Sequence, residues 1–375
     1  MSEFEQKIKE WENTYFKEWA TEEKGYISPW GKDKEGNFRY EPKHNYPISP
    51  KENFKRVFSG QKPVYIPLLS DMTAFSPGIL PDHRVRAWAL EMDSSLPGDP
   101  NCKGGEDMFG VFWEYVPVTG GSMVRPGEPK IPDITRWEEY ITFPDISLWD
   151  WEGSAQRNKA ITETDRPLRI WLMNGLNERL ISLMDFKNVM IAYVDEEQKE
   201  GVKRFYNALC DFYDELIYRY RKYYGADVLM FNDDWGTQKG PQFSPDTARE
   251  MLVPYMRRIV ESCHKNDMHF ELHCCGKNEK LTEVIVEAGV DIWLPQEDLN
   301  DMEAIFNASK DSGMYMLLPS GTNPDMSDEQ VYEAAEIFME KYGYTGHIGV
   351  GGTFKPSHKN FEKYLYALSR EYFAR

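Results

Sequence analysis

The sequence is poor in cysteine and has no long apolar run. Only 5 of its 375 residues are cysteine, and an odd number in a long chain does not form a disulfide framework. No apolar stretch reaches the roughly 18 residues that a membrane helix needs. The charged N-terminus, MSEFEQKIKEWENTYF, lacks the apolar core of a signal peptide. These absences predict a protein of the reducing cytoplasm.

Basic residues are outnumbered by acidic ones. The chain has 44 Lys and Arg against 62 Asp and Glu, a formal net charge of −18. This balance argues against a nucleic-acid partner, because phosphate contacts need a basic surface. Aromatic residues are abundant at 14% and include 11 Trp and 22 Tyr. Most such rings fill cores, but this many would also line a large cleft.

A short apolar run, a loop and an amphipathic helix alternate along the chain from about residue 60. This alternation predicts eight strands, and helices separate the last five, as a parallel sheet requires. The predicted strands cover residues 64–69, 111–116, 168–173, 227–232, 269–275, 291–295, 314–319 and 347–352.

Two of the helices between strands have clear boundary signals. One is opened by Ser244 and interrupted by Pro254, which we expect to kink it or offset its start. The other begins at the capping-box pair Ser327 and Gln330 and ends near Gly343. Both patterns favour crossover helices of the kind that join parallel strands.

Eight strands with mostly helical crossovers predict a (β/α)8 TIM barrel. The barrel is expected over residues 61–375, with residues 1–60 as a helical N-terminal segment packed on it. The Gly- and Pro-rich stretches 71–110 and 119–165 are interpreted as long insertions in the first βα loops. No second domain is predicted.

In this fold the active site lies at the C-terminal ends of the strands. The predicted strand ends therefore bring polar residues together around one mouth. These residues are Asp71, Asn174, Asp233, Asp234, His273, Cys275, Gln296, Glu297 and Gly352. Substrate contacts are expected from Asp71, Asn174, Trp235 and Gln296.

The stretch HFELHCCG ends the fifth strand. Because side chains alternate across a strand, Glu271, His273 and Cys275 share one face, while Leu272 and Cys274 share the other. A carboxylate, an imidazole and a thiol are side chains that bind zinc. The alternative is a buried histidine beside an inert core thiol. Cys274 is expected to be packed.

The third zinc ligand is left open by the sequence. Glu271 has the correct face but lies one residue pair deeper, about 6–7 Å along the strand. Asp234 and Glu297 follow neighbouring strands at the same mouth. Each carboxylate could instead orient a ligand or be a solvated loop charge. Three protein ligands would leave the open position of a catalytic zinc site.

The stretch DDWGTQ follows the fourth strand. One interpretation is an ordinary capped loop, in which acidic residues before glycine are common. The other is a catalytic group in which Asp233, Asp234 and the amide of Gln238 lie at the barrel mouth, with the Trp235 ring over it. Its place at a strand end favours the second interpretation.

FNDDWGTQKGPQFSP (231–245) and HCCG (273–276) resemble the uroporphyrinogen decarboxylase superfamily, and more closely its zinc-dependent, corrinoid-linked methyltransferase branch. Those proteins carry an aspartate pair with Gly-x-Gln after strand four and His-x-Cys-Gly after strand five. GVDIWLPQ (289–296) and KENFKRVFSGQKPVYIP (51–67) extend the resemblance. It spans roughly residues 50–370.

Two departures from the family pattern matter. The decarboxylases that act on uroporphyrinogen carry an arginine-rich segment after strand one, where this chain has SDMTAFSPG (70–78) without arginine. Many thiol-methylating relatives have a late cysteine as third zinc ligand, where this chain has GVGGTFKPSHKN (349–360). Porphyrinogen decarboxylation is therefore not expected, and a third ligand must come from elsewhere or be absent.

The resemblance implies an enzyme in which zinc acts as a Lewis acid on a small methylated donor. The methyl group would pass to cob(I)alamin on a separate corrinoid protein, since the chain lacks the Asp-x-His-x-x-Gly signature of corrinoid-binding domains. A methoxylated aromatic donor suits the aromatic excess, while thiol and amine donors stay open. The alternatives are a decarboxylase-like lyase, with Asp233 or Asp234 as proton donor, and a non-catalytic ligand-binding barrel.

Overall fold

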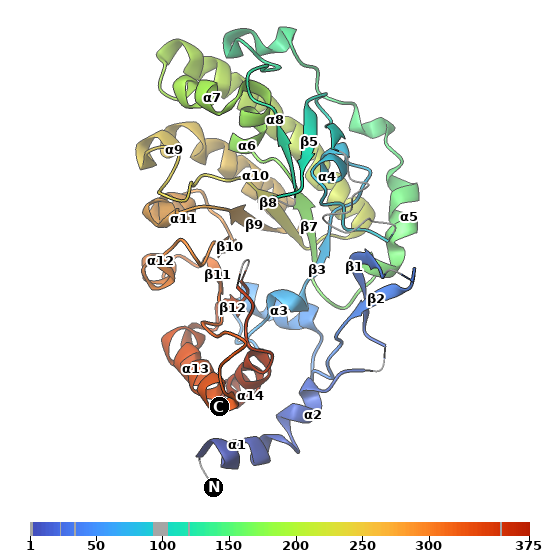
Figure 1. The fold of residues 1–375 in the computed structure, drawn as a ribbon, viewed down its shortest axis with the longest axis vertical. Helices are drawn as coiled ribbons and strands as arrows, with labels where there is room; N and C mark the ends of the chain where they lie inside the picture. Colours follow the sequence, from blue (N-terminus) through green and yellow to red (C-terminus); the bar gives the residue numbers. More distant parts are fainter. Residues whose placement is uncertain (1–2, 23, 34, 93–103, 119–120, 353–354) are drawn as a thin grey trace.

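The computed structural model describes residues 3–22, 24–33, 35–92, 104–118, 121–352 and 355–375. Its centre is a curled parallel sheet (Figure 1). In sheet order its strands are β12 (Ile348–Val350), β11 (Tyr315–Leu318), β10 (Ile292–Pro295), β9 (His269–Cys274), β8 (Val228–Asn232), β7 (Leu168–Leu172) and β3 (Thr73–Phe75). A parallel bridge joins Leu68, just ahead of β3, to Val350 of β12. The two ends of the sheet thus meet, and the fold is an α/β TIM barrel.

Helices connect the strands from β7 onward and cover the outside of the sheet (Figure 1). Strands β8, β10, β11 and β12 are buried along their whole length, as expected where helices cover one face and a barrel interior the other. None of the described helices is both long and apolar enough to cross a membrane. The connecting elements are α6 (Asn177–Met184), α7 (Phe186–Ala192), α8 (Glu196–Arg219), α9 (Pro245–Met251), α10 (Val253–Lys265), α11 (Thr282–Glu287), α12 (Met302–Ser309), α13 (Asp328–Lys341) and, after β12, α14 (Phe361–Phe373).

The boundary signals in two of these connections are confirmed. The Ser244 hydroxyl accepts a hydrogen bond from the Thr247 amide at 3.1 Å and caps α9. Pro254 lies in the first turn of α10, where its missing N–H costs no helical hydrogen bond, so the segment divides into two helices. Ser327 and Gln330 form the predicted reciprocal capping box at the start of α13.

The first half of the barrel departs from the prediction. Residues 64–69 contribute one isolated bridge rather than a strand. Residues 111–116 do form a strand, β5 (Phe112–Val116), but it pairs with β4 (Gly105–Glu106) and β6 (Gly121–Val124) in a separate antiparallel sheet. The barrel strand β3 lies in a stretch predicted as loop. Three residues are too few for a periodic signal, and periodicity does not reveal which strands pair.

The N-terminal segment contains a hairpin that the sequence did not predict. Its elements are α1 (Glu3–Trp11), α2 (Tyr15–Trp19), β1 (Tyr26–Lys32), β2 (Phe38–Glu41) and α3 (Pro50–Phe58). Helices α1 and α2 attach to the last helix, α14. The buried Trp11 indole donates a hydrogen bond to Glu371 at 2.8 Å, and Glu18 accepts one from Tyr366 at 2.6 Å.

A buried charge cluster joins the insertions to the barrel. Arg179 of α6 is fully buried and donates hydrogen bonds to Asp107, at 2.6 Å, and to Asp82 of α4 (Pro81–Val85). Asp107 also accepts from the Trp113 indole at 3.0 Å, and Asp82 from the Asn174 amide at 2.8 Å. Buried charges are tolerated when they are paired and hydrogen-bonded in this way.

Replacing Arg179 by alanine should strongly destabilise the protein, because Asp82 and Asp107 would be left buried without a partner. Breaking one side of a buried ion pair typically costs about 3–5 kcal/mol. The matched control is Arg125→Ala, since Arg125 is exposed and paired with Glu114 at the surface; we expect it to change the stability very little, because water screens such a pair. Urea unfolding of the two variants measures the difference, and equal losses would contradict the assignment.

Candidate functional site

The register between β8 and β9 assembles the candidate site. Asn232, at the end of β8, is paired with His273 of β9, and the Asp233 amide donates to the His273 carbonyl at 3.0 Å. Asp234 and Cys275 each follow two positions after this pair and therefore leave the sheet side by side. His273 and Cys275 line the barrel interior, as the alternation of side chains predicted.

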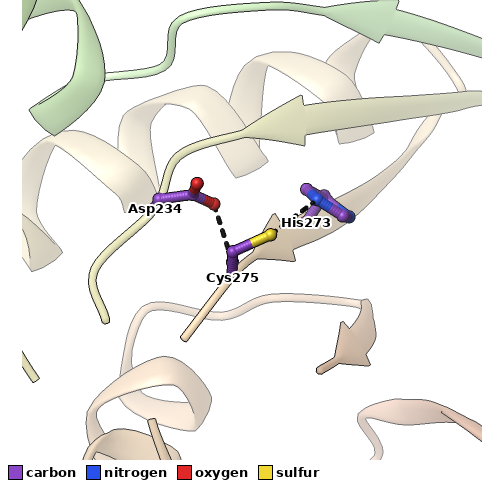
Figure 2. A group of neighbouring side chains, drawn as sticks. All are labelled: Asp234, His273 and Cys275. Carbon is purple, nitrogen blue, oxygen red and sulfur yellow. Dashed lines mark hydrogen bonds between the residues drawn. The ribbon is translucent and has the colours of Figure 1, made fainter. Parts of the chain in front are cut away.

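Asp234, His273 and Cys275 form one compact group (Figure 2). Each offers one ligand atom, and the three atoms lie within 4.8 Å of one another. Nε2 of His273 is 3.4 Å from Sγ of Cys275, and the Cys275 amide donates to Oδ1 of Asp234 at 2.7 Å. Imidazole, thiolate and carboxylate are all zinc ligands, and three of them leave a fourth position open. The described side chains thus fit a catalytic zinc site.

Of the three carboxylates that the sequence left open as third ligand, the structure brings Asp234 to this group and not Glu271. Both carboxylate oxygens of Glu271 accept hydrogen bonds from the Arg169 guanidinium, and the Nε–Oε2 distance is 2.5 Å. Glu271 has no measurable exposure to solvent and lies one residue pair deeper in the barrel. Glu297 lines the same cavity but accepts from the Lys355 amide instead.

Burial sets the protonation states of His273 and Cys275. Burial lowers the pKa of His273, and the nearby Asp234 carboxylate opposes this effect only in part. The imidazole is therefore neutral at pH 7, which is its metal-binding form. Burial, followed by the charge of Asp234, raises the pKa of the Cys275 thiol well above its ordinary value. A metal at this site would have to displace the proton from Cys275.

Cys274 is packed, as predicted. Its side chain faces the hydrophobic core and is 1% exposed. Its Sγ accepts hydrogen bonds from the Trp235 amide and from Nδ2 of Asn278, both at 3.2 Å. The two adjacent cysteines therefore differ in role because successive side chains point to opposite faces of the strand.

The prediction that the Trp235 ring covers the barrel mouth is wrong. The ring is fully buried, packs against Phe243 and donates from Nε1 to Asp233 at 2.8 Å. Asp233 is also fully buried and accepts from the Glu178 amide at 2.9 Å. Burial raises the pKa of Asp233 to about 7. Asp233 and Trp235 thus support the site from behind, and only Asp234 of this stretch reaches the cavity.

Gln238 does not lie at the site, contrary to its predicted position. It is exposed in a tight turn, in which the Thr237 amide donates to the Gly240 carbonyl. The glutamine held near the site is Gln242, whose Nε2 donates to the Asp234 carbonyl at 3.1 Å and whose Oε1 accepts from Asn177 at 3.0 Å. The turn reverses the chain, so that Gln242 lies near the site where the spacing had suggested Gln238.

The remaining predicted residues divide between the cavity and its supports. Asp71 and Gly352 line the cavity, and burial raises the pKa of Asp71 to about 7. Asn174 is fully buried behind the wall, with a positive φ of 62°. Oε1 of Gln296 accepts from the Gly276 amide at 2.8 Å and orders the turn after β9. Neither Asn174 nor Gln296 borders the cavity, so direct substrate contact is not favoured for them.

A cavity of about 1390 Å³ adjoins the Asp234, His273 and Cys275 group. Its volume exceeds the roughly 300–1,000 Å³ of ordinary small-ligand pockets. The N-terminal segment, the insertions and β7 all contribute to its walls. The indoles and phenols in these walls belong to Trp19, Tyr26, Trp30, Tyr46, Trp88 and Trp171. The aromatic cleft expected from composition is therefore present.

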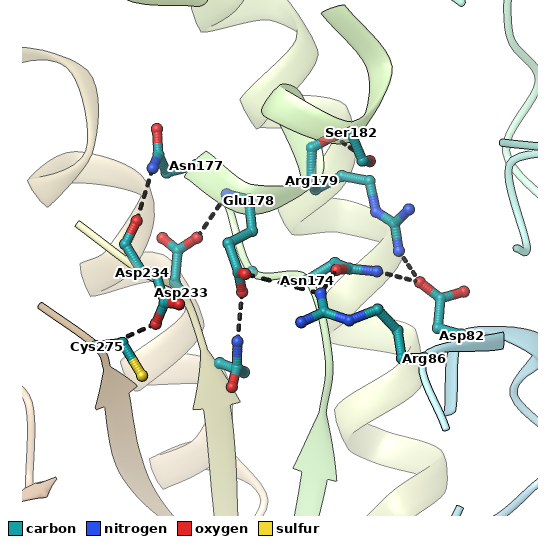
Figure 3. Close-up of polar contacts among 12 residues, drawn as sticks. Asp82, Arg86, Asn174, Asn177, Glu178, Arg179, Ser182, Asp233, Asp234 and Cys275 are labelled. Atoms are coloured by element: carbon teal, nitrogen blue, oxygen red, sulfur yellow. Dashed lines mark hydrogen bonds and ion pairs between the residues drawn. The ribbon is translucent and has the colours of Figure 1, made fainter. Parts of the chain in front are cut away.

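The sequence did not single out several charged residues at this site (Figure 3). Glu178 lies in the first turn of α6 and accepts a hydrogen bond from Asn232, and its Oε1 is 3.7 Å from Nη1 of Arg86. Burial, with the charge of Asp234, raises the pKa of Glu178 to about 8. Arg86, Arg166 and Arg169 line the cavity although the segment after strand one has no arginine. Arg86 and Arg166 come from loops, and Arg169 comes from β7, which was predicted as a strand but without a role for this side chain.

Residues 179–313, which include all three members of the group, match the family described as uroporphyrinogen decarboxylase (URO-D). No curated protein matches the sequence. Among solved structures, a methyltransferase from Methanosarcina mazei aligns over 88% of this chain and 100% of its own, with a TM-score of 0.53 and 15% identity.

Two further solved structures are more distant. Xylanase B from Clostridium stercorarium F9 aligns over 55% of this chain and 73% of its own, with a TM-score of 0.34 and 14% identity. A sugar phosphate isomerase/epimerase from Parabacteroides distasonis aligns over 64% and 82%, with a TM-score of 0.32 and 12% identity. Neither bears on function. The family match confirms the resemblance to uroporphyrinogen decarboxylase over residues 179–313, and the similarity to the solved methyltransferase supports the α/β TIM-barrel fold.

Proposed function

We propose that the protein is a methyltransferase that moves a methyl group from a methoxylated aromatic compound to the cobalt of a reduced corrinoid carried by a separate protein. The observation that carries the proposal is the group of Asp234, His273 and Cys275 at the C-terminal ends of β8 and β9, beside a large aromatic-lined cavity. The similarity in fold to a methyltransferase supports the reaction class. The donor and the corrinoid partner rest on the resemblance of the sequence and on the cavity.

Zinc is the metal that this donor set favours. When bound, it supplies Lewis acidity to the atom that bears the methyl group. The residues prepare the site: the Cys275 amide holds Asp234 in place at 2.7 Å, and burial keeps the His273 imidazole neutral. Gln296 and Asn300 each hold the backbone of Gly276, at 2.8 and 2.9 Å, so the turn that carries Cys275 is rigid.

The chemistry needs a dry, flat binding site. In the proposed reaction the bond between the ether oxygen and the methyl carbon breaks, and a carbon–cobalt bond forms with the electron pair of cobalt(I). The departing phenolate then takes a proton from solvent water. Trp88 and Trp171, with ring centroids 5.7 Å apart, can hold an aromatic ring against the wall and exclude water. The cavity volume leaves room for both a donor and the face of a corrin ring.

The lyase alternative has less support. Asp233, one of its two suggested proton donors, is fully buried, and its oxygens accept hydrogen bonds from the Glu178 amide and the Trp235 indole. It does not border the cavity. Asp234 alone remains for that role, and its place beside His273 and Cys275 favours a metal ligand.

Zinc binding should depend on the three grouped residues. We expect Asp234→Asn, His273→Ala and Cys275→Ala each to weaken zinc affinity by about 10–100-fold or more while the protein stays folded. The matched controls are Cys274→Ser and Glu271→Gln, which should retain zinc because neither side chain belongs to the group. Metal content by mass spectrometry and competition with a chelator measure the affinities. Loss of zinc in Glu271→Gln with retention in Asp234→Asn would reverse the choice of third ligand.

Zinc binding should also release about one proton at pH 7. Because burial raises the pKa of Cys275, the thiol is protonated without metal, whereas His273 is already neutral and has no proton to lose. Calorimetric titration in buffers of different ionisation enthalpy counts the released protons. Cys275→Ser should release none, and a wild-type count near zero would mean that the thiol is not a ligand.

The purified protein, given zinc and a methoxylated aromatic, should convert cob(I)alamin or its carrier protein to the methylated form and release the free phenol. The loss of cob(I)alamin absorbance follows the reaction with guaiacol-like, thiol, amine and methanol donors. His273→Ala should lower the rate at least 100-fold, because the phenolate leaves poorly without charge stabilisation. Turnover only with a non-aromatic donor would change the substrate. No transfer from any donor, with zinc present, would overturn the proposed reaction.

A further inference from the structure

Arg86 borders the cavity with most of its guanidinium left unused by the protein. Its contacts to Asn174, by hydrogen bond, and to Glu178, at 3.7 Å, are both made through Nη1. Among the described residues, neither Nε nor Nη2 donates a hydrogen bond, and neither is a fully buried atom without a partner. The side chain is 16% exposed and lines the cavity. Its Nε and Nη2 therefore present an open fork of N–H donors there.

This fork is held in a fixed place. The guanidinium carbon lies 4.8 Å from the centroid of the Trp113 ring, and the Asn174 amide that accepts from Nη1 is itself tied to Asp82 at 2.8 Å. Asp82 is held in turn by the buried Arg179. A surface arginine would sample many rotamers, whereas the packing around Arg86 has already removed that freedom. A preorganised donor pair is the usual property of a recognition site.

The backbone beside Arg86 turns so that two side chains reach the cavity together. Ala87 has a positive φ of 66°, a backbone conformation that residues other than glycine rarely adopt. Ala87 itself is 8% exposed, while Arg86 and Trp88 on either side of it both line the cavity. An unfavourable backbone conformation of this kind persists only where the surrounding contacts hold it in place. Here it accompanies a cation and a flat ring on the same wall.

Arg86 also lies near the metal-ligand group. It lines the same cavity as His273 and Cys275. The nearby guanidinium of Arg169 is occupied, because it makes two hydrogen bonds to Glu271. Of these two arginines, only Arg86 has a pair of N–H donors available to a ligand.

We infer that Arg86 recognises a carboxylate on the methyl donor, so that the preferred substrates are methoxylated aromatic acids. The fork of Nε and Nη2 matches a carboxylate with two parallel hydrogen bonds, which neutral substituents cannot reproduce. The ring of such an acid would lie against Trp88, with its anionic end on Arg86. The methoxy group in this inference rests on the proposed function, whereas the carboxylate is inferred from the free donors of Arg86.

Binding without turnover tests the inference. The ligands are 3- and 4-methoxybenzoate and, as neutral counterparts, the two methoxybenzyl alcohols, titrated against the zinc-loaded protein with tryptophan fluorescence and calorimetry. We expect the wild type to bind one of the acids more tightly than the corresponding alcohol. Arg86→Gln should weaken the binding of that acid by about 10–100-fold and the binding of its alcohol by less than about threefold. Arg86→Lys keeps the positive charge and loses the pair of parallel donors, so its affinity for the acid should lie between those of the wild type and Arg86→Gln.

The matched control is Arg125→Gln, which removes an exposed arginine that does not line the cavity and should leave binding unchanged. Thermal unfolding of each variant checks the fold, and Arg86→Lys keeps the test decisive if Arg86→Gln unfolds. Equal binding of acids and alcohols by the wild type, or equal weakening of both by Arg86→Gln, would overturn the inference. The latter result would assign Arg86 to the ether or the departing phenolate. Arg86-dependent binding of an acid without any methyl transfer would sustain the carboxylate site and overturn the proposed reaction.

Discussion

The candidate site depends on the hydrogen-bonded register between β8 and β9. With Asn232 opposite His273, the residues that follow the two strands leave the sheet as neighbours, and the Cys275 amide bonds the Asp234 carboxylate at 2.7 Å. A shift of one residue would turn His273 and Cys275 toward the helices and bring Leu272 and Cys274 into the barrel. The zinc-type donor set therefore exists only in this register.

Buried charges support the site from two sides. Below it, Arg169 of β7 reaches across the barrel to Glu271 of β9. Beside it, Arg179 binds Asp82 and Asp107 and so ties the loop that carries Arg86 to α6. Such pairs are costly to bury and contribute little to net stability compared with apolar packing. Their positions next to the cavity are consistent with a role in orienting side chains.

The second half of the barrel was predictable because its signals are local and repeated. Strands β8 to β12 are apolar runs followed by helices, and some of these helices begin at recognisable caps, such as Ser244 and the Ser327–Gln330 pair. The first half was not, because β3 has only three residues and β5 pairs outside the barrel. Strand pairing is a non-local choice that a window of sequence does not contain.

The sequence by itself determined the barrel class, the face shared by His273 and Cys275, and the packed role of Cys274, since each follows from a two-residue or 3.6-residue period. Only the tertiary structure decided the third member of the group, because Asp234 and Glu271 are both carboxylates carried by neighbouring strands near the same end of the barrel. Arg169, which is distant from Glu271 in sequence, binds the Glu271 carboxylate and so makes it unavailable as a metal ligand. Folding also brought Arg86 to the cavity, because contacts between remote segments determine which charges are paired and which remain free.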